Sequence, residues 1–180
     1  HFNAGMTDGD LVYLPDPGRM AARLFPVTSY PLDQVLYVNV LTGQRKGALL
    51  HAVGIDDSGQ GRLFCGISGA GKSTTARLWC DHPNVNILSD DRIIVRKSER
   101  GFLMYGTPWN GEAQFASSRS AAVRQVFFLR QGKDHGLCQL STSEALRRLI
   151  MCCFATFWNP EGMAFTLSFL EEMATALPCY

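Results

Sequence analysis

The sequence predicts an α/β fold, a single domain with a mixed, strand-rich sheet flanked by helices. Two observations predict it. A short apolar run at residues 62–66 leads through a glycine-rich loop into a helical pattern at 72–80, and a second apolar run at 85–89 ends in two aspartates. Strand and helix patterns alternate in this way in α/β proteins. A chain of 180 residues is long enough for one core, so we expect one domain over residues 1–180.

The elements before the loop are predicted from apolar runs and breakers. Four prolines between residues 11 and 31 indicate an irregular N-terminal segment over residues 1–30. Residues 35–41 and 47–55 are rich in apolar and β-branched residues and flank a turn-like stretch, which predicts a pair of strands. Residues 56–61 predict a tight turn into the strand at 62–66.

The elements after the loop are also predicted from apolar runs, breakers and capping patterns. The helix at 72–80 should end before Pro83, and residues 93–97, 101–106 and 123–132 are expected to be strands. Ser141 and Glu144 form a capping-box pattern ahead of an apolar periodic run, so a helix should begin there. A last helix is expected over 165–176. The final residues, 178–180, should start a strand that is cut short by the end of the chain.

Composition argues against several classes of partner. The net charge of +1 gives no bulk attraction to nucleic acid or to an acidic membrane surface, and no apolar run approaches the roughly 18 residues of a membrane span. The start of the chain does not resemble a secretory signal. Six cysteines without a C-x-x-C pair indicate free thiols rather than zinc ligands or disulfides. We therefore expect a cytoplasmic protein that binds neither nucleic acid nor membrane.

The loop matches the pattern G-x-x-x-x-G-K-[ST], which is typical of P-loops. Its backbone N–H groups can surround an anion at a helix N-terminus, its lysine can reach the β- and γ-phosphates, and its serine hydroxyl can bind Mg²⁺. A plain glycine turn is the alternative, but it would need neither lysine nor hydroxyl. The candidate nucleotide-binding residues are Gly66, Ser68, Gly69, Ala70, Gly71, Lys72, Ser73 and Thr74.

Three further residues could complete a site. Asp90 and Asp91 follow the strand at 85–89, whose end should lie beside the loop, and two adjacent carboxylates can divide their roles between Mg²⁺ and an attacking hydroxyl. A solvated Asp-Asp turn is the alternative. His51 lies in an apolar run, where it is either a core residue or a partner that tunes one of these carboxylates.

The chain resembles the HPr kinase/phosphorylase family, whose nucleotide-binding core is shared with ATP-dependent phosphoenolpyruvate carboxykinases. The resemblance lies in "LLHAVGI", "CGISGAGKSTTARLW", "LSDDRIIV" and "YGTPWNGE", and it covers about three-fifths of the chain, residues 31–140. It implies that Asp90 is the base for an acceptor serine, that His51 and Asp91 form a supporting pair, and that Glu112 is a Mg²⁺ candidate. Trp109 and Asn110 would either shape the acceptor side or form a structural turn.

The prediction is therefore an ATP-dependent, Mg²⁺-assisted kinase that phosphorylates a serine-type hydroxyl of a protein or peptide. Its catalytic residues would be Asp90, Lys72 and His51, and its metal ligands Ser73, Asp91 and Glu112. Arg119, Arg124 and Arg130 could stabilise the transferred charge, or they are solvated edge charges.

The expected partners are a nucleotide and the acceptor, with a second copy of the chain left open. Two alternatives remain. One is a carboxykinase-like or small-molecule kinase, for which no arginine cluster is evident. The other is a regulatory module that senses ATP or ADP without catalysis, which would need neither Asp90 nor His51.

Overall fold

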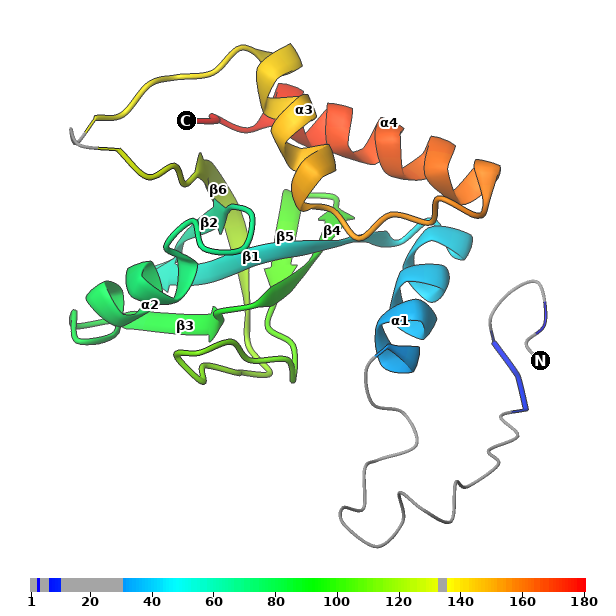
Figure 1. Cartoon of the computed structure of the whole chain (residues 1–180), viewed down its shortest axis with the longest axis horizontal. Helices are drawn as coiled ribbons and strands as arrows, with labels where there is room; N and C mark the ends of the chain where they lie inside the picture. Colours follow the sequence, from blue (N-terminus) through cyan, green and yellow to red (C-terminus); the bar gives the residue numbers. More distant parts are fainter. Residues whose placement is uncertain (1–2, 4–6, 11–30, 133–135) are drawn as a thin grey trace, which may run out of the picture.

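A computed structural model describes residues 3, 7–10, 31–132 and 136–180. Within these residues it contains four helices and six strands, arranged as a mixed sheet with helices packed around it (Figure 1). In chain order the elements are α1 (Leu32–Gly43), β1 (Gly47–Asp57), β2 (Gln60–Cys65), α2 (Lys72–Cys80), β3 (Val85–Ser89), β4 (Arg92–Ser98), β5 (Gly101–Tyr105), β6 (Ser120–Phe128), α3 (Thr142–Cys152) and α4 (Pro160–Ala176).

The six strands form one sheet in the order β2-β6-β5-β4-β1-β3, and β2 also pairs with β1. The strand β1 changes partner along its length. Its first half, residues 47–51, pairs with β4, whereas its second half pairs with β2 and with β3. The pairing of β2 with β6 is parallel, and the other pairings between these strands are antiparallel. The pairings β1–β2–β6–β5–β4–β1 therefore form a closed circuit, with β3 added at one side of β1.

Alternate residues of β1 face different helices, as the period of a strand requires. Leu50 and Ala52 belong to the main core, which also contains the apolar faces of α3 and α4. Val53 and Ile55 belong to a second core cluster under α2, and Leu49 packs in a third cluster with α1. Because β1 contributes to all three clusters, it fixes the relative positions of these helices and of the loops between them.

Most elements after the loop agree with the prediction. The helix α2 and the strand β3 have the predicted bounds, and the Ser141 hydroxyl accepts a hydrogen bond from the Glu144 N–H, which confirms the cap of α3. The last helix, α4, begins at Pro160 rather than at residue 165, because Asn159 caps it and Pro160 suits its first turn. The strand β6 ends at Phe128, earlier than predicted.

The predicted strand at 35–41 is wrong, because these residues lie in α1. Val38, Leu41 and Thr42 are buried at helical spacing, and Val38 and Leu41 pack against Leu49 of β1. Val and other β-branched residues disfavour helices by only a few tenths of a kcal/mol each, so packing of one apolar face decides the structure here.

The chain end contributes to the sheet, as the expected short strand at 178–180 suggested. Cys179 forms a parallel bridge with Val126 of β6, and the Phe128 N–H donates to the Tyr180 carbonyl at 2.8 Å. The predicted irregular segment 1–30 falls almost entirely outside the described residues. Among the described helices, none combines the length and apolar character needed to cross a bilayer.

Candidate functional site

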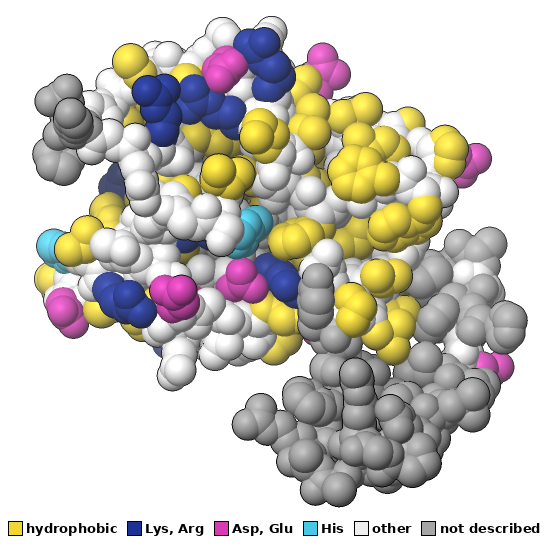
Figure 2. Space-filling view, in the orientation of Figure 1, with side chains coloured by type: hydrophobic (Ala, Val, Ile, Leu, Met, Phe, Trp, Pro, Cys, Tyr) yellow, Lys and Arg dark blue, Asp and Glu magenta, His cyan; other side chains and the backbone are white. Residues whose placement is uncertain are grey.

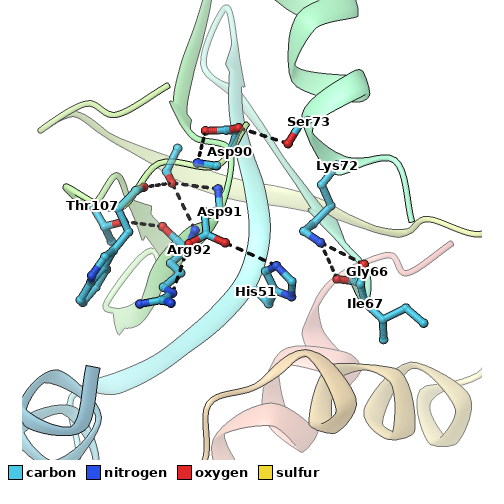
Figure 3. A network of polar contacts seen from close by, with 12 residues as sticks. His51, Gly66, Ile67, Lys72, Ser73, Asp90, Asp91, Arg92 and Thr107 are labelled. Carbon is cyan, nitrogen blue, oxygen red and sulfur yellow. Dashed lines mark hydrogen bonds and ion pairs between the residues drawn. The ribbon is translucent and has the colours of Figure 1, made fainter. Parts of the chain in front are cut away.

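The glycine-rich loop, the end of β3 and the middle of β1 surround one hollow of about 310 Å³. Its walls come from residues 68–69 and 71–74 of the loop and first turn of α2, from Asp90 and Asp91, from His51, and from Gly111 and Glu112. Figure 3 shows how His51, Lys72, Ser73, Asp90 and Asp91 lie relative to one another. Several candidate residues that are far apart in the sequence, such as His51, Lys72 and Asp90, therefore lie together. The predicted loop residues Gly66 and Ala70 do not line this hollow.

The loop has the backbone conformation that its glycines permit. Gly69 has φ +79° and Gly71 has φ +105°, both in the left-handed region that other residues rarely adopt. The helix α2 begins at Lys72, directly after Gly71, and the first N–H groups of a helix have no partner within it. These groups and the helix dipole make the end of α2 that faces the hollow favourable for an anion.

Lys72 is held back against the loop. Its ammonium donates to the carbonyl oxygens of Gly66 at 2.9 Å and of Ile67 at 3.0 Å, and the residue is only 7% exposed (Figure 3). Burial lowers the pKa of Lys72, although the negative charge of Asp91 opposes this shift. A positive charge that has lost most of its water at the wall of a hollow is favourable for an anionic ligand.

Asp90 is a fully buried carboxylate with four donors around it. Its Oδ1 accepts from the N–H groups of Gly111 (2.8 Å) and Phe115 (3.1 Å), and its Oδ2 accepts from Ala113 N–H (2.8 Å) and the Ser73 hydroxyl (3.2 Å). The residue is 1% exposed. The segment after β5 is therefore wrapped around this side chain, and Ser73 joins it to the first turn of α2.

Asp91 points to the opposite side of the same strand end and contacts an imidazole and a guanidinium group. Its Oδ1 lies 3.4 Å from His51 Nε2, and its Oδ2 lies 3.2 Å from Arg92 Nε (Figure 3). Burial alone would raise the pKa of Asp91, but the hydrogen bond from His51 and the charge of Arg92 lower it overall. The contact between His51 and Asp91 that the resemblance implied is therefore present in the structure.

Sequence reasoning missed Arg92. Its guanidinium carbon lies 5.1 Å from the ring centroid of Trp109 and 5.2 Å from that of Phe154, within cation–π range of both. Trp109 in turn donates its indole N–H to Asp33 of α1 at 2.6 Å. An arginine next to the Asp-Asp pair was visible in the sequence, but the aromatic rings that hold it come from distant segments.

Of the remaining candidate residues, Glu112 lines the hollow and the others lie outside it. Glu112 is exposed at the rim of the hollow, and its backbone carbonyl accepts from Arg77. Trp109 packs against Tyr37 and Arg92 and does not line the hollow, which favours the structural alternative for its turn. None of the three arginines at 119, 124 and 130 lines the hollow either.

The predicted metal ligands Ser73, Asp91 and Glu112 all line this one hollow. Over the part of the chain that the structure describes, no group of three or more His, Cys, Asp or Glu side chains is arranged to hold a metal ion. A Mg²⁺ ion often keeps several waters and needs only one or two carboxylates together with phosphate oxygens. The residues thus fit Mg²⁺ only as part of a metal–phosphate complex.

Comparison with known proteins corrects the resemblance. The family model that matches the chain is that of SynChlorMet cassette protein ScmC, over residues 30–167, and no model of a kinase family matches. The expected membership of the HPr kinase/phosphorylase family is therefore wrong. The prediction of an ATP-dependent serine kinase is corrected by the same finding, since the matching family is one of cassette proteins and not of kinases. A search of curated proteins gave no match.

Proposed function

We propose that this chain, which belongs to the SynChlorMet cassette protein ScmC family, is a regulatory module that binds ATP or ADP without transferring a phosphoryl group. The observation that carries the proposal is the hollow itself. Its first wall holds two glycines with positive φ, a buried lysine and the N-terminal turn of α2, and Asp90 on the facing wall accepts a hydrogen bond from Ser73 of that turn.

Phosphate binding is supported by Lys72 and by the free N–H groups at the start of α2, while the three carboxylates on the other walls would need Mg²⁺ beside the phosphates. The loop would act as a P-loop, in which backbone N–H groups hold the β-phosphate and Lys72 exchanges the carbonyls of Gly66 and Ile67 for phosphate oxygens. The lowered pKa of Lys72 supports this exchange, because an anion would relieve part of the cost of burying the ammonium. Mg²⁺ would be held by Ser73 with help from Asp91 or Glu112, and it would neutralise the phosphate charge.

The surroundings of the carboxylates support binding rather than catalysis. A base must offer a free lone pair to the proton that it takes. A carboxylate has about four lone-pair sites, and Asp90 already receives four hydrogen bonds while buried. Asp91 lies between His51 and Arg92 and has a lowered pKa, so it is a weaker base than an ordinary carboxylate.

The test measures binding and turnover on the same preparation. We expect calorimetric titration to show binding of Mg²⁺–ATP and Mg²⁺–ADP. Lys72→Met should weaken binding at least tenfold, since a hydrogen bond between charged groups contributes about 1.5–3 kcal/mol. The matched control is Lys46→Met, which removes an exposed lysine outside the hollow and should bind normally.

Incubation with γ-labelled ATP then separates sensing from catalysis. We expect the purified chain alone to produce no ADP, and we expect its addition to a cell extract to give no more protein label than the extract gives without it. Failure of both nucleotides to bind would overturn the proposal as a whole. Tight binding together with transfer of label would overturn its non-catalytic part.

A further inference from the structure

A second hollow, of about 260 Å³, lies behind the glycine-rich loop and shares no residue with the first. It opens between the end of β6 and the helix α3. Its apolar wall includes Phe128, Leu129, Met151 and Cys152, and its charged rim consists of Arg130, Arg148 and Glu144. We refer to it as the back pocket. The loop contributes Gly66 and Ile67, whose carbonyls hold Lys72.

The charge at this rim is positive and only partly compensated. Glu144 accepts from Arg148 at 2.8 Å and from Arg147 at 2.7 Å, so one carboxylate serves two guanidinium groups. Arg130 is exposed, and no ion pair involves it within the described residues. In Figure 2, dark blue side chains gather beside α3, with a magenta acidic side chain among them and yellow hydrophobic side chains next to them.

The wall below these charges is apolar and open to a ligand. Met151 is 70% exposed and Ile67 is 59% exposed, although both are large hydrophobic residues. Arg148 lies over the ring of Phe128, with its guanidinium carbon 5.9 Å from the ring centroid, so the cation and the aromatic wall are adjacent. Ligand pockets combine such apolar walls with a few polar groups that fix orientation.

We propose that the back pocket binds a carboxylate carried on an aromatic or branched aliphatic body. The planar guanidinium groups of Arg130 and Arg148 match a carboxylate, which they can bind through two parallel hydrogen bonds. The body of the ligand replaces water over Met151, Phe128 and Leu129. This site goes beyond the nucleotide site and has a separate lining, and the two are in contact through Gly66 and Ile67, whose carbonyls accept from Lys72.

The probe for the test is 3-phenylpropionate, titrated into the full chain without nucleotide and followed by the methionine methyl resonances. We expect the Met151 methyl resonance to shift with saturation, while those of the fully buried Met104 and Met173 stay in place. The neutral analogue 3-phenylpropionamide should bind about tenfold more weakly, because it cannot form charge-assisted pairs.

Two matched pairs of variants identify the arginines. Arg148→Gln should weaken binding of the probe about tenfold, whereas Arg147→Gln should not, although both arginines pair with the same Glu144. In the same way, Arg130→Gln should weaken binding and Arg124→Gln, an exposed residue of β6, should not.

Three results would each overturn the proposal: a Met151 resonance that does not shift, equal affinity for the acid and the amide, or equal losses within a matched pair. Loss of nucleotide binding in Lys72→Met, with this titration unchanged, would separate the two proposals.

Discussion

The carboxylate of Asp90 makes a strong prediction, because one atom can be changed without changing the shape of the side chain. In Asp90→Asn the amide oxygen can still accept from Gly111 and Phe115, as Oδ1 does now. The amide nitrogen then takes the place of Oδ2 and faces the N–H of Ala113 and the hydroxyl of Ser73. Two N–H donors would oppose each other in a site that is 1% exposed.

The expected loss of stability follows from these contacts. Leaving a buried donor unsatisfied costs about 1–3 kcal/mol, and a hydrogen bond to a charged group contributes about 1.5–3 kcal/mol. The hydrogen bond from Ala113 N–H is lost, and the remaining hydrogen bonds no longer involve a charged group. We therefore expect Asp90→Asn to lower the free energy of unfolding by about 3 kcal/mol. For a chain of this length, about 1 kcal/mol corresponds to a change of about 2–4 °C in Tm.

Thermal unfolding followed by circular dichroism measures this shift directly. The control is Glu112→Gln, an exposed carboxylate in the segment that wraps around Asp90, whose Tm should stay within about 2 °C. A Tm for Asp90→Asn equal to that of the control would refute our reasoning. It would mean that the four hydrogen bonds around the carboxylate contribute little to folding.

The remaining predictions concern pH and backbone packing. The pKa of Asp91 is lowered in the folded state, so its stabilising effect is present above about pH 4 and is lost as the pH falls through the lower, folded pKa. His51→Leu removes one cause of this shift, and the Tm difference from the unaltered chain should shrink between pH 5 and pH 3; a constant difference would count against the pair. Gly61→Ala should lower the free energy of unfolding in urea by about 1–3 kcal/mol, because a Cβ there would lie 2.1 Å from the Ala122 carbonyl oxygen. Gly136→Ala, whose Cβ would have no neighbour within 4 Å, should be nearly neutral, and equal losses would contradict the steric argument.

The sequence predicted α2 and β3 well, because strong local signals bound them. Gly71 opens the helix with a positive φ, and the helix stops shortly before Pro83. Residues 35–41 lacked such a signal. Their β-branched residues suggested a strand, and only the burial of Val38 and Leu41 against β1 makes them helical.

The candidate site was partly predictable for a similar reason. Lys72, Ser73 and Asp90 carry their chemistry in their side chains and could be picked out from motif and spacing. The groups that hold Asp90 are backbone N–H groups of residues 111–115, and any residue type except proline can supply them. Our proposal distinguishes binding from proton transfer by the four hydrogen bonds that fill the lone-pair sites of Asp90. No residue pattern in the sequence could have indicated these bonds.

The change of partner along β1 affects how the molecule opens. His51 pairs with Arg92 in the last register with β4, and Ala52 pairs with Cys65 in the first register with β2. Amides of a strand held on both sides exchange with deuterium only when a large part of the molecule opens. Beyond this change of partner, residues 54–57 of β1 lie between β2 and β3. The amides of Gly54 and Ile55 should therefore be among the slowest to exchange, whereas the glycine-rich loop, built on exposed turns, can rearrange around a ligand while the strand beneath it stays closed.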